Sequence, residues 1–449
     1  MSREIIKKEY CRIEFRLASP LSVGSGNNEL TDKDIVKKRN KEPYIPGSGI
    51  AGATRNSLTS LPKAEQEKYF GFVHINKDTS GKSNNKVLTA ENSRVLFYDA
   101  RILKEDLDKC YVTKRDCVAL DEYKTALPGK KFDMEILEPG IHMVTFVEQN
   151  FYDDTDISII DLIEKAWLQH SISFGSKTMR GHGDVDSVRV KKRIFRLKGV
   201  NDSEIDEFVD FDMYDESCWK QIKAAEEREM SGTTDGTILI KLNLIQNGGI
   251  SIRRYSTNIS KDTVQPDYEQ LTIHENTKSP IPVVPGTSWA GAFRHCMSQW
   301  LDTEQIEDLF GYVKEKEKLK RISKISFSET QLVGAREKIL SRNAIDRFSG
   351  GTVKGALFTE KTYYGGRGDL CITLKGNTTI EQRRALCAAI TDLHMGYLAV
   401  GGETSIGRGL FCEDCVTIIN GDNRTIITGE TGDSLYKKLE HAMNDGGRE

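Results

Sequence analysis

The stretch PGSGIAGATR, from Pro46 to Arg55, recurs later in the chain as PGTSWAGAFR, from Pro285 to Arg294. Both copies follow the pattern P-G-[ST]-x-x-x-G-x-x-R, and each comes directly after a short run that is typical of a strand. A glycine-rich turn that occurs in two copies, each followed by a predicted helix and an arginine, indicates an internal repeat. A repeat is the first feature to examine because it constrains the whole fold.

Further pairs of segments match in the same order in the two halves. They are YFGFV (69–73) with LFGYV (309–313), RVLFYDARI (94–102) with KISFSETQL (324–332), GKKFDMEI (129–136) with GALFTEKT (355–362), and FGSKTMRGHG (174–183) with VGGETSIGRG (400–409). Chance matches between glycine loops would not preserve this order. Each half therefore reads strand, polar loop, glycine turn, helix, strands, helix, glycine loop and strand, which is the order of a βαββαβ unit.

The sequence predicts an α+β protein with two tandem RRM-like, or ferredoxin-like, domains that carry loop and thumb-like insertions. The first domain spans 1–197 and the second spans 237–449, where TILIKLNLIQ (237–246) restarts the pattern of YCRIEFRLAS (10–19). Residues 198–236 between them are acidic, polar and weakly patterned, and they are expected to form a linker.

Composition narrows the class of protein. The 449 residues carry 64 Lys+Arg and 67 Asp+Glu, a net charge of -3, so a nucleic-acid binder of this kind must gather its basic residues locally. The N-terminus has no apolar signal region and no run approaches about 18 apolar residues, so we expect a cytoplasmic protein without a membrane span. Cys412 and Cys415 form the only close cysteine pair, and structural zinc is not expected there because no second pair lies nearby.

The glycine turns have the chemistry of a phosphate site. Ser48 and Ser288 are expected at helix N-caps, with free N–H groups and the positive end of the helix dipole beside them. Arg55 and Arg294 follow about two helical turns later, near the same face. The alternative is a helix that needs only a cap and a tight turn, with its arginine in solvent.

The glycine loops add basic residues at backbone bends, which suits a loop that follows a sugar-phosphate chain. A dinucleotide site is excluded because here the helix precedes the loop and the strand follows it, the reverse of that motif. The strand-like run RVKKRIFRLK (189–198) is a further candidate for RNA contact, and KEKEKLKRISK (314–324) is a weaker one. The predicted RNA-binding residues are Gly47, Ser48, Gly49, Gly52, Arg55, Gly175, Lys177, Arg180, Gly181, His182, Gly183, Gly286, Thr287, Ser288, Gly291, Arg294, Gly401, Gly407, Arg408 and Gly409.

Together, the two P-G-[ST]-x-x-x-G-x-x-R turns, the FG turn after each and the late glycine loops resemble the RAMP superfamily of CRISPR-associated proteins. The segment RDCVALDEYKTALPGKKFDMEIL (115–137) looks like part of the repeated backbone subunit of type III effector complexes, and two such units in one chain resemble the double subunits of type III-D systems. This resemblance implies an antiviral ribonucleoprotein in which the chain holds CRISPR guide RNA, pairs it with target RNA and contacts other subunits. In the family, a thumb-like hairpin interrupts the guide–target duplex.

The resemblance also implies a catalytic aspartate in the loop before each glycine turn, acting with Mg²⁺ or Mn²⁺. In the first half Asp32 fits best and would bind the metal, with Asp34 as the alternative. In the second half Asp267 is the choice and Asp262 the alternative, and this half fits less well. Many relatives carry a lysine before the second motif glycine, whereas this chain has Ala51 and Ala290, which puts more of the guide contact on Arg55, Arg294 and the glycine loops.

Three functions stay open at this point. The chain is a metal-dependent endoribonuclease subunit of a CRISPR complex, or a non-catalytic guide-binding scaffold in the same complex, or a guide-processing nuclease that acts alone. The third class relies on a histidine near its N-terminal helix, and the first histidine here is His74, in no suggestive setting. Segments 72–92 and 99–127 are the candidate thumbs of the first half.

Overall fold

The computed structural model describes residues 4–26, 31–58, 61–76, 87–120, 125–169, 172–199, 201–226, 236–254, 266–274, 280–314 and 319–444. The chain forms two compact units. Unit 1 comprises residues 1–115, 134–178 and 183–230, and unit 2 comprises residues 116–133, 179–182 and 231–449. The short stretches 116–133 and 179–182 therefore come from the first half of the sequence but belong to unit 2.

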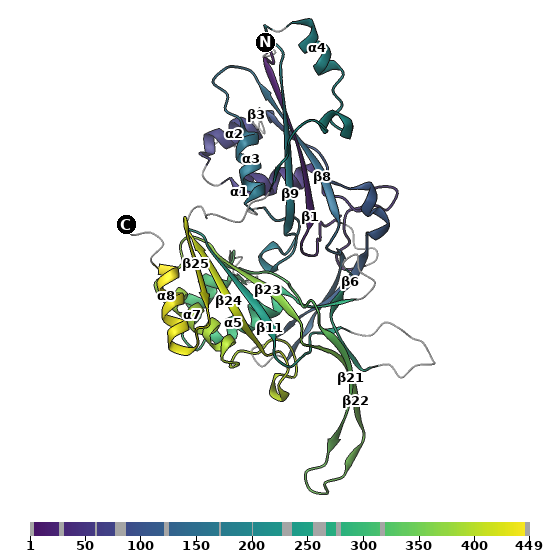
Figure 1. The fold of residues 1–449 in the computed structure, drawn as a ribbon, viewed down its shortest axis with the longest axis vertical. Coiled ribbons are helices and arrows are strands. Elements are labelled where there is room, and N and C mark those ends of the chain that lie inside the picture. Colours follow the sequence, from purple (N-terminus) through teal and green to yellow (C-terminus); the bar gives the residue numbers. More distant parts are fainter. Residues whose placement is uncertain are drawn as a thin grey trace, which may run out of the picture. The chain divides into compact units, whose positions relative to one another are not determined.

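The sheet of unit 1 is built around β1 (Lys7–Leu17), as Figure 1 shows. Antiparallel partners flank it, β8 (His142–Phe151) on one side and β9 (Val185–Arg196) on the other, and β4 (Val95–Phe97) extends the sheet beyond β8. Numbered within the βαββαβ unit, the strands lie in the order fourth, first, third, second. The predicted ferredoxin-like sheet of the first half is thus confirmed.

Two helices cover one face of this sheet because alternate residues of β1 point into the same core. Cys11, Ile13, Phe15 and Leu17 are buried there at every second position. They meet α1 (Gly47–Ser57) through Ile50 and α3 (Ile159–Leu168) through its apolar side, which includes the buried Trp167. The Ser158 hydroxyl caps α3 by accepting a hydrogen bond from the Asp161 amide at 3.3 Å.

The opposite face of the unit 1 sheet is covered by residues 201–222, here called the covering segment. It contains α4 (Asp202–Val209) and the 3-10 turn η3 (Glu216–Trp219), and it ends beside β10 (Ala225–Glu226), which pairs with β9. Trp219 is fully buried in an apolar cluster with Tyr10, Val144, Phe146 and Phe195 of the sheet. These residues fall in the stretch that we expected to be a linker, so the composition concealed a folded part of unit 1.

Unit 2 repeats the sheet of unit 1. β11 (Ile238–Gln246) lies between β23 (Arg367–Leu374) and β24 (Phe411–Asn420), and β19 (Ile325–Phe327) pairs with β23, all antiparallel. The strand order is therefore the same as in unit 1, with β25 (Asn423–Thr428) added beside β24. Two domains with one strand order are what the order of matching segments predicted.

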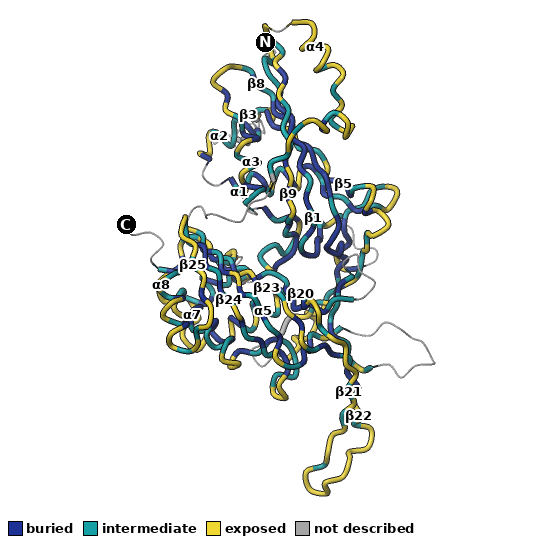
Figure 2. The backbone as a smooth tube through the Cα atoms, viewed as in Figure 1, coloured by how far each residue is buried: buried dark blue, intermediate teal, exposed yellow. Residues whose placement is uncertain are grey.

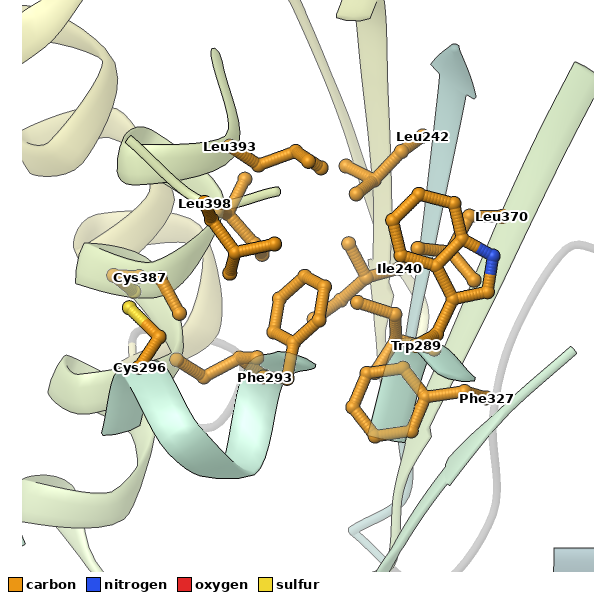
Figure 3. Close-up of a cluster of buried hydrophobic side chains, with 14 of the residues drawn as sticks. Ile240, Leu242, Trp289, Phe293, Cys296, Phe327, Leu370, Cys387, Leu393 and Leu398 are labelled. Atoms are coloured by element: carbon orange, nitrogen blue, oxygen red, sulfur yellow. The ribbon is translucent and has the colours of Figure 1, made fainter. Parts of the chain in front are cut away.

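The core of unit 2 lies between this sheet and α5 (Gly286–Met297), α7 (Ile380–His394) and α8 (Gly432–Asn444). Figure 3 shows Trp289 and Phe293 of α5 with Phe327 of β19, close to strand residues such as Ile240. Trp289 and Phe293 are both fully buried. The two aromatic residues of the second glycine motif therefore belong to the core.

The first glycine of each motif is required by close packing of backbone against backbone. A Cβ on Gly47 would lie 2.2 Å from the carbonyl oxygen of Phe97, and a Cβ on Gly286 would lie 2.2 Å from the carbonyl oxygen of Phe327. Real Cβ atoms never approach an oxygen so closely. The same strand carbonyl thus meets the same helix start in both halves, which confirms the duplication at the level of single atoms.

Hairpins extend from both units. In unit 2, β21 (Arg336–Ile345) and β22 (Thr352–Tyr364) form a long hairpin that projects from the body of the unit, with an outer part that is almost entirely exposed (Figures 1 and 2). Its counterpart in sequence is the hairpin of β6 (Val112–Leu120) and β7 (Ala126–Leu137). The segments 72–92 and 99–127, which we considered as thumbs, each contain hairpin strands.

The remaining elements are short. In the first half of the sequence they are β2 (Phe72–Asn76), β3 (Val87–Glu91), β5 (Arg101–Ile102), α2 (Lys63–Phe70), η1 (Lys104–Lys109) and η2 (Thr178–Arg180). In the second half they are β12 (Gly249–Ile250), β13 (Arg253–Arg254), β14 (Tyr268–Gln270), β15 (Thr272–Ile273), β16 (Ile281–Val284), β17 (Tyr312–Lys314), β18 (Leu319–Arg321), β20 (Thr330–Gln331), α6 (Thr303–Phe310) and η5 (Thr404–Ile406). Among the described residues, none of the helices has the length and apolarity that crossing a membrane requires.

Candidate nucleic-acid interface

Neither glycine turn places its serine at a helix N-cap. α1 begins at Gly47 and α5 at Gly286, so the N-caps are Pro46 and Pro285, which have no hydroxyl to offer. Ser48 and Ser288 are already inside the first helical turn. The expected serine caps are therefore wrong, because α1 begins two residues and α5 three residues earlier than the pattern indicated.

The amides at the start of α1 are also less available than we expected. The Gly47 N–H donates to the Asp99 carboxylate at 2.7 Å, and the Gly49 and Ile50 amides both donate to the Pro46 carbonyl, at 2.8 and 3.1 Å. Asp99 thus supplies from a neighbouring segment the cap that the turn itself lacks. A phosphate at this helix start would have to compete with that carboxylate.

Each helix instead presents a stripe of small residues to solvent. On α1 the stripe consists of the exposed Ser48, Gly49 and Gly52, with the half-buried Arg55 at its end. On α5 the stripe consists of the exposed Thr287, Gly291 and Arg294, next to the half-buried Ser288. A Cβ on Gly52 or on Gly291 would meet no atom within 4 Å, so a ligand backbone has room to approach both helices closely.

The glycine loops owe most of their glycines to packing. A Cβ on Gly183 would lie 1.8 Å from the Phe174 carbonyl oxygen, and a Cβ on Gly409 would lie 1.9 Å from the Val400 carbonyl oxygen. Gly175 and Gly401 similarly face carbonyl oxygens of Ser22 and Ser251, at 2.4 and 2.7 Å. Gly407 is different, because it is exposed and nothing lies within 4 Å of its Cβ position.

The basic residues of the first glycine loop differ in exposure. Arg180 is exposed, Lys177 is half-buried in a left-handed conformation at φ 61°, and His182 is buried. Arg180 and Gly181 belong to unit 2, where a Cβ on Gly181 would lie 2.6 Å from the Phe327 carbonyl oxygen. Of these three side chains, Arg180 is the best placed to meet an RNA.

Arg408, the basic residue of the second loop, is directed into the protein. It is only 8% exposed and its guanidinium bonds the Glu360 carboxylate and the Tyr364 hydroxyl. A buried guanidinium that is already paired does not offer its charge to a phosphate. The structure therefore does not support the expected RNA contact at Arg408.

The basic strand 189–198 is largely occupied by the protein itself. Lys191 donates to the Trp219 carbonyl at 3.0 Å, Arg193 donates to the Cys218 carbonyl at 3.0 Å, and Lys192 lies 2.6 Å from the Asp161 carboxylate. Bonds to Asp161 and Glu164 outweigh the effect of burial and raise the pKa of Lys192. We expected a wet basic face here, but part of it lies under the covering segment. In the other basic run, residues 315–318 lie outside the described part of the chain.

The loop before the first glycine turn separates its two aspartates clearly. The Asp34 carboxylate is buried and accepts hydrogen bonds from the Thr31 amide at 2.9 Å and the Thr31 hydroxyl at 2.8 Å. Asp32, between them, is exposed. The Glu135 amide donates to the Lys33 carbonyl at 3.0 Å, so β7 holds the loop close to Asp32. The loop thus commits Asp34 to structure and presents Asp32 to solvent.

The corresponding aspartate of the second half, Asp267, takes part in hydrogen bonds that connect its loop to a strand. Asp267 is exposed, but its carboxylate accepts a hydrogen bond from the Thr359 amide at 2.8 Å, and its own amide donates to the Thr359 carbonyl at 2.7 Å. Asp267 therefore joins its loop to β22. Its alternative, Asp262, lies outside the described residues.

Within the described residues, no three His, Cys, Asp or Glu side chains gather as a metal site. A metal at Asp32 would therefore be held by that single carboxylate, with water and RNA oxygens completing its shell. Mg²⁺ accepts this, since it keeps several waters and is commonly bound through one or two carboxylates plus phosphates. An exposed aspartate in an anchored loop fits such an ion.

Sequence reasoning missed the end of the β21–β22 hairpin. There Phe348 is 97% exposed. The Asp346 carboxylate accepts from the Phe348 and Ser349 amides, at 3.0 and 2.7 Å, and so orders the turn. The ordered turn therefore holds a large aromatic side chain in solvent, where a ligand can reach it. The pattern DRFSGG (346–351) was the available signal, an aromatic residue between turn-forming residues.

The family model of the RAMP superfamily matches residues 14–186 and, a second time, residues 242–412. The two matches cover more than half of the chain and coincide with the two repeated domains. No curated protein matches the chain.

Proposed function

The chain belongs to the RAMP superfamily, and on that premise we propose that it is a double backbone subunit of a type III CRISPR ribonucleoprotein, which binds guide RNA and cleaves complementary target RNA. The family match indicates a CRISPR-associated RNA-binding subunit with two RAMP regions. The type III complex, the guide as ligand and the cleavage of a target are parts of the proposal.

The observation that carries the RNA-binding part is the pair of small-residue stripes on α1 and α5. Gly52 and Gly291 leave open space on exposed helix faces, and an arginine follows each after three residues. Such a surface lets a sugar-phosphate chain approach the helix backbone while a guanidinium binds a phosphate. The stripe recurs in both domains, so it supports an extended guide that contacts both in the same way.

The β21–β22 hairpin is the thumb-like insertion in this proposal. Its tip presents Phe348, and exposed apolar residues such as Ile345 and Leu357 lie behind it. Aromatic side chains stack on nucleobases and gain about 1–3 kcal/mol per base. A hairpin of this kind between guide and target would hold one base pair apart.

Asp32 is the proposed catalytic residue. Strand scission needs the 2′-OH in line with the phosphorus, and a nucleotide splayed by a thumb has that freedom. The exposed Asp32 carboxylate would orient the 2′-OH or hold a hydrated Mg²⁺ or Mn²⁺, which supplies positive charge for the developing phosphorane. Asp267 is the second candidate, and its carboxylate accepts a hydrogen bond from the Thr359 amide.

The test compares Asp32→Ala with Asp154→Ala in the assembled complex, because Asp154 is an exposed aspartate of the same unit with no role in the proposal. We expect Asp32→Ala to abolish one target cut while guide binding is retained, and Asp154→Ala to cut normally. Unchanged cutting by Asp32→Ala would establish the non-catalytic scaffold instead. Cleavage of repeat-containing RNA by the isolated chain would point to the guide-processing alternative.

A further inference from the structure

A group of charged side chains lies at the base of the β21–β22 hairpin in unit 2, and two of them, Glu360 and Arg408, are buried. Its first carboxylate is Glu360 of β22, which is 3% exposed. Arg408 of the glycine loop bonds Glu360, and Arg342 of β21 lies 3.0 Å from the same carboxylate. Glu360 therefore connects both strands of the hairpin to the glycine loop.

The second carboxylate, Glu403, belongs to the glycine loop itself. Arg342 donates to it at 2.7 Å, and Arg253 of β13 donates to it at 3.3 Å. Burial raises the pKa of Glu360, whereas bonds to Glu360 and Arg342 outweigh burial and lower the pKa of Glu403. We call Glu360, Glu403, Arg253, Arg342 and Arg408 the charged strut.

The backbone of the glycine loop is shaped to point both of its charged residues inward. Glu403 takes the left-handed conformation at φ 56°, which is unfavourable for a residue with a side chain. The Arg408 amide donates to the Glu403 carbonyl at 3.3 Å, and the Gly409 amide donates to the Gly249 carbonyl at 2.8 Å. A Cβ on Gly249 would lie 2.7 Å from Arg408 and 2.9 Å from Tyr364, so the glycine there makes room for their contact.

The cost of burying the Glu360 and Arg408 charges indicates the role of the charged strut. Removing charges from water is expensive, and an apolar core in their place is often at least as stable. A two-stranded hairpin also has little stability of its own, so its direction is decided where it joins the body of the domain. Directional charge pairs define that direction more narrowly than apolar contacts, which have no preferred orientation.

We propose that Glu360 and Glu403 are positioning residues, which fix the direction of the β21–β22 hairpin relative to the second glycine loop. The consequence for RNA rests on the proposed function. If the glycine loop contacts the RNA backbone and Phe348 holds a base apart, a fixed hairpin direction keeps the distance between these two RNA positions constant. The geometric statement itself concerns the protein without RNA.

The experiment measures that geometry in the full-length protein. Spin labels carried by unnatural amino acids replace Phe348 at the tip and Glu381, an exposed residue in the first turn of α7, and pulsed electron paramagnetic resonance gives the distance distribution between them. We expect a narrow distribution for the parent protein. Glu360→Gln and Glu403→Gln should broaden it to roughly twice that width, because the stem loses its directional bonds.

Glu337→Gln is the matched control. Glu337 lies on β21 of the same hairpin and pairs with Lys361 at 2.9 Å, but its side chain is 44% exposed and it lies outside the charged strut. Its distribution should stay narrow. Glu403→Asp keeps the negative charge, so its distribution of label-to-label distances should be narrower than that of Glu403→Gln. A variant whose fold was merely destabilised would not recover in this way.

A thermal melt shows whether each variant is folded. If Glu360→Gln fails to fold, Arg342→Gln takes its place, since Arg342 is 37% exposed and its loss leaves less uncompensated charge. A narrow distribution in folded Glu360→Gln, Glu403→Gln or Arg342→Gln overturns the inference. Guide RNA is absent from this measurement, so failure of the proposed function appears separately, as a parent protein that binds no guide.

Discussion

The carboxylate of Asp34 accepts hydrogen bonds from both the amide and the hydroxyl of Thr31, at 2.9 and 2.8 Å. This pair closes the loop and leaves Asp32 on its outer side. Two aspartates that the sequence could not separate thereby acquire different roles, one in the fold and one at the surface.

Asp34→Ala should therefore destabilise the protein, whereas Asp32→Ala should not. Loss of Asp34 leaves the buried Thr31 donors without their acceptor, which costs about 1–3 kcal/mol of unfolding free energy. Asp32→Ala should change that free energy by no more than about 0.5 kcal/mol, as is usual at exposed sites. Urea unfolding of both variants checks this, and equal destabilisation would contradict the assignment.

Gly47 and Gly52 of the first motif should respond in opposite ways to substitution by alanine. Gly47→Ala forces a Cβ against the Phe97 carbonyl, 2.2 Å away, and should cost about 1–3 kcal/mol as overpacking does. Gly52→Ala meets no neighbour and should stabilise α1 by about 0.5–1 kcal/mol, because alanine loses less backbone freedom in a helix. Thermal unfolding measures both, with Gly286→Ala and Gly291→Ala as the matched pair in unit 2.

The arginines should separate into RNA-binding and structural classes. Arg294→Ala removes an exposed guanidinium, so guide binding should weaken and the slope of log affinity against log salt should fall by about 1. Its effect on unfolding should be small. A filter-binding titration over a salt series checks the slope, and an unchanged slope would remove Arg294 from the interface.

Arg408→Ala should behave in the other way. The substitution removes the guanidinium that pairs with the buried Glu360 carboxylate. Removing one partner of a buried ion pair lowers the free energy of unfolding by about 3–5 kcal/mol. Urea unfolding should therefore show a large loss of stability. The salt slope of guide binding, measured on the folded fraction, should stay the same, and a reduced slope would return Arg408 to the set of RNA contacts.

Acid should weaken unit 2 through Asp308. Burial acts to raise the pKa of Asp308, but its bonds to Lys324 and Gln382 and the charge of Arg321 outweigh burial and hold the pKa below the ordinary 3.8. A carboxylate with a lowered folded-state pKa stabilises the protein above pH 3.8, and this stabilisation is lost as the pH falls through the lower folded value. Asp308→Asn should lose less stability than the parent protein over that acid range in urea titrations, and parallel curves would contradict the prediction.

Much of the fold was accessible from sequence because the repeat supplied an internal comparison. The alternation of YCRIEFRLAS predicted β1, and the same alternation in TILIKLNLIQ predicted β11. The covering segment was not predicted because its composition is acidic, and its aromatic residues that pack on the sheet, such as the buried Trp219 and the half-buried Phe211, follow no regular period. The apolar face of the unit 1 sheet, on which these aromatic residues pack, explains why the segment is ordered.

The sequence predicted which residue types occur at the candidate site, but not which way their side chains and amides point. Both motifs predicted a helix start with an arginine two turns on, and both helices are present. The predicted serine caps were wrong because both helices begin before the serine, and in α1 the Gly47 amide is capped instead by Asp99, 52 positions away in the sequence. The charged strut was invisible for the same reason, since Glu360 and Arg408 are 48 positions apart.

The order of the matching segments predicted the duplication and the class of each domain, because periodicity and turn chemistry are local properties that a chain displays along its length. The family was suggested by the resemblance of the two glycine motifs and is shown by the family-model match. The tertiary structure alone decided which charges face water. Arg294 and Arg408 are both arginines beside a glycine motif, yet one is exposed and the other is buried against Glu360. Exposure and ion pairing depend on partners that folding brings from distant positions, and these contacts determine which residues are available to bind RNA.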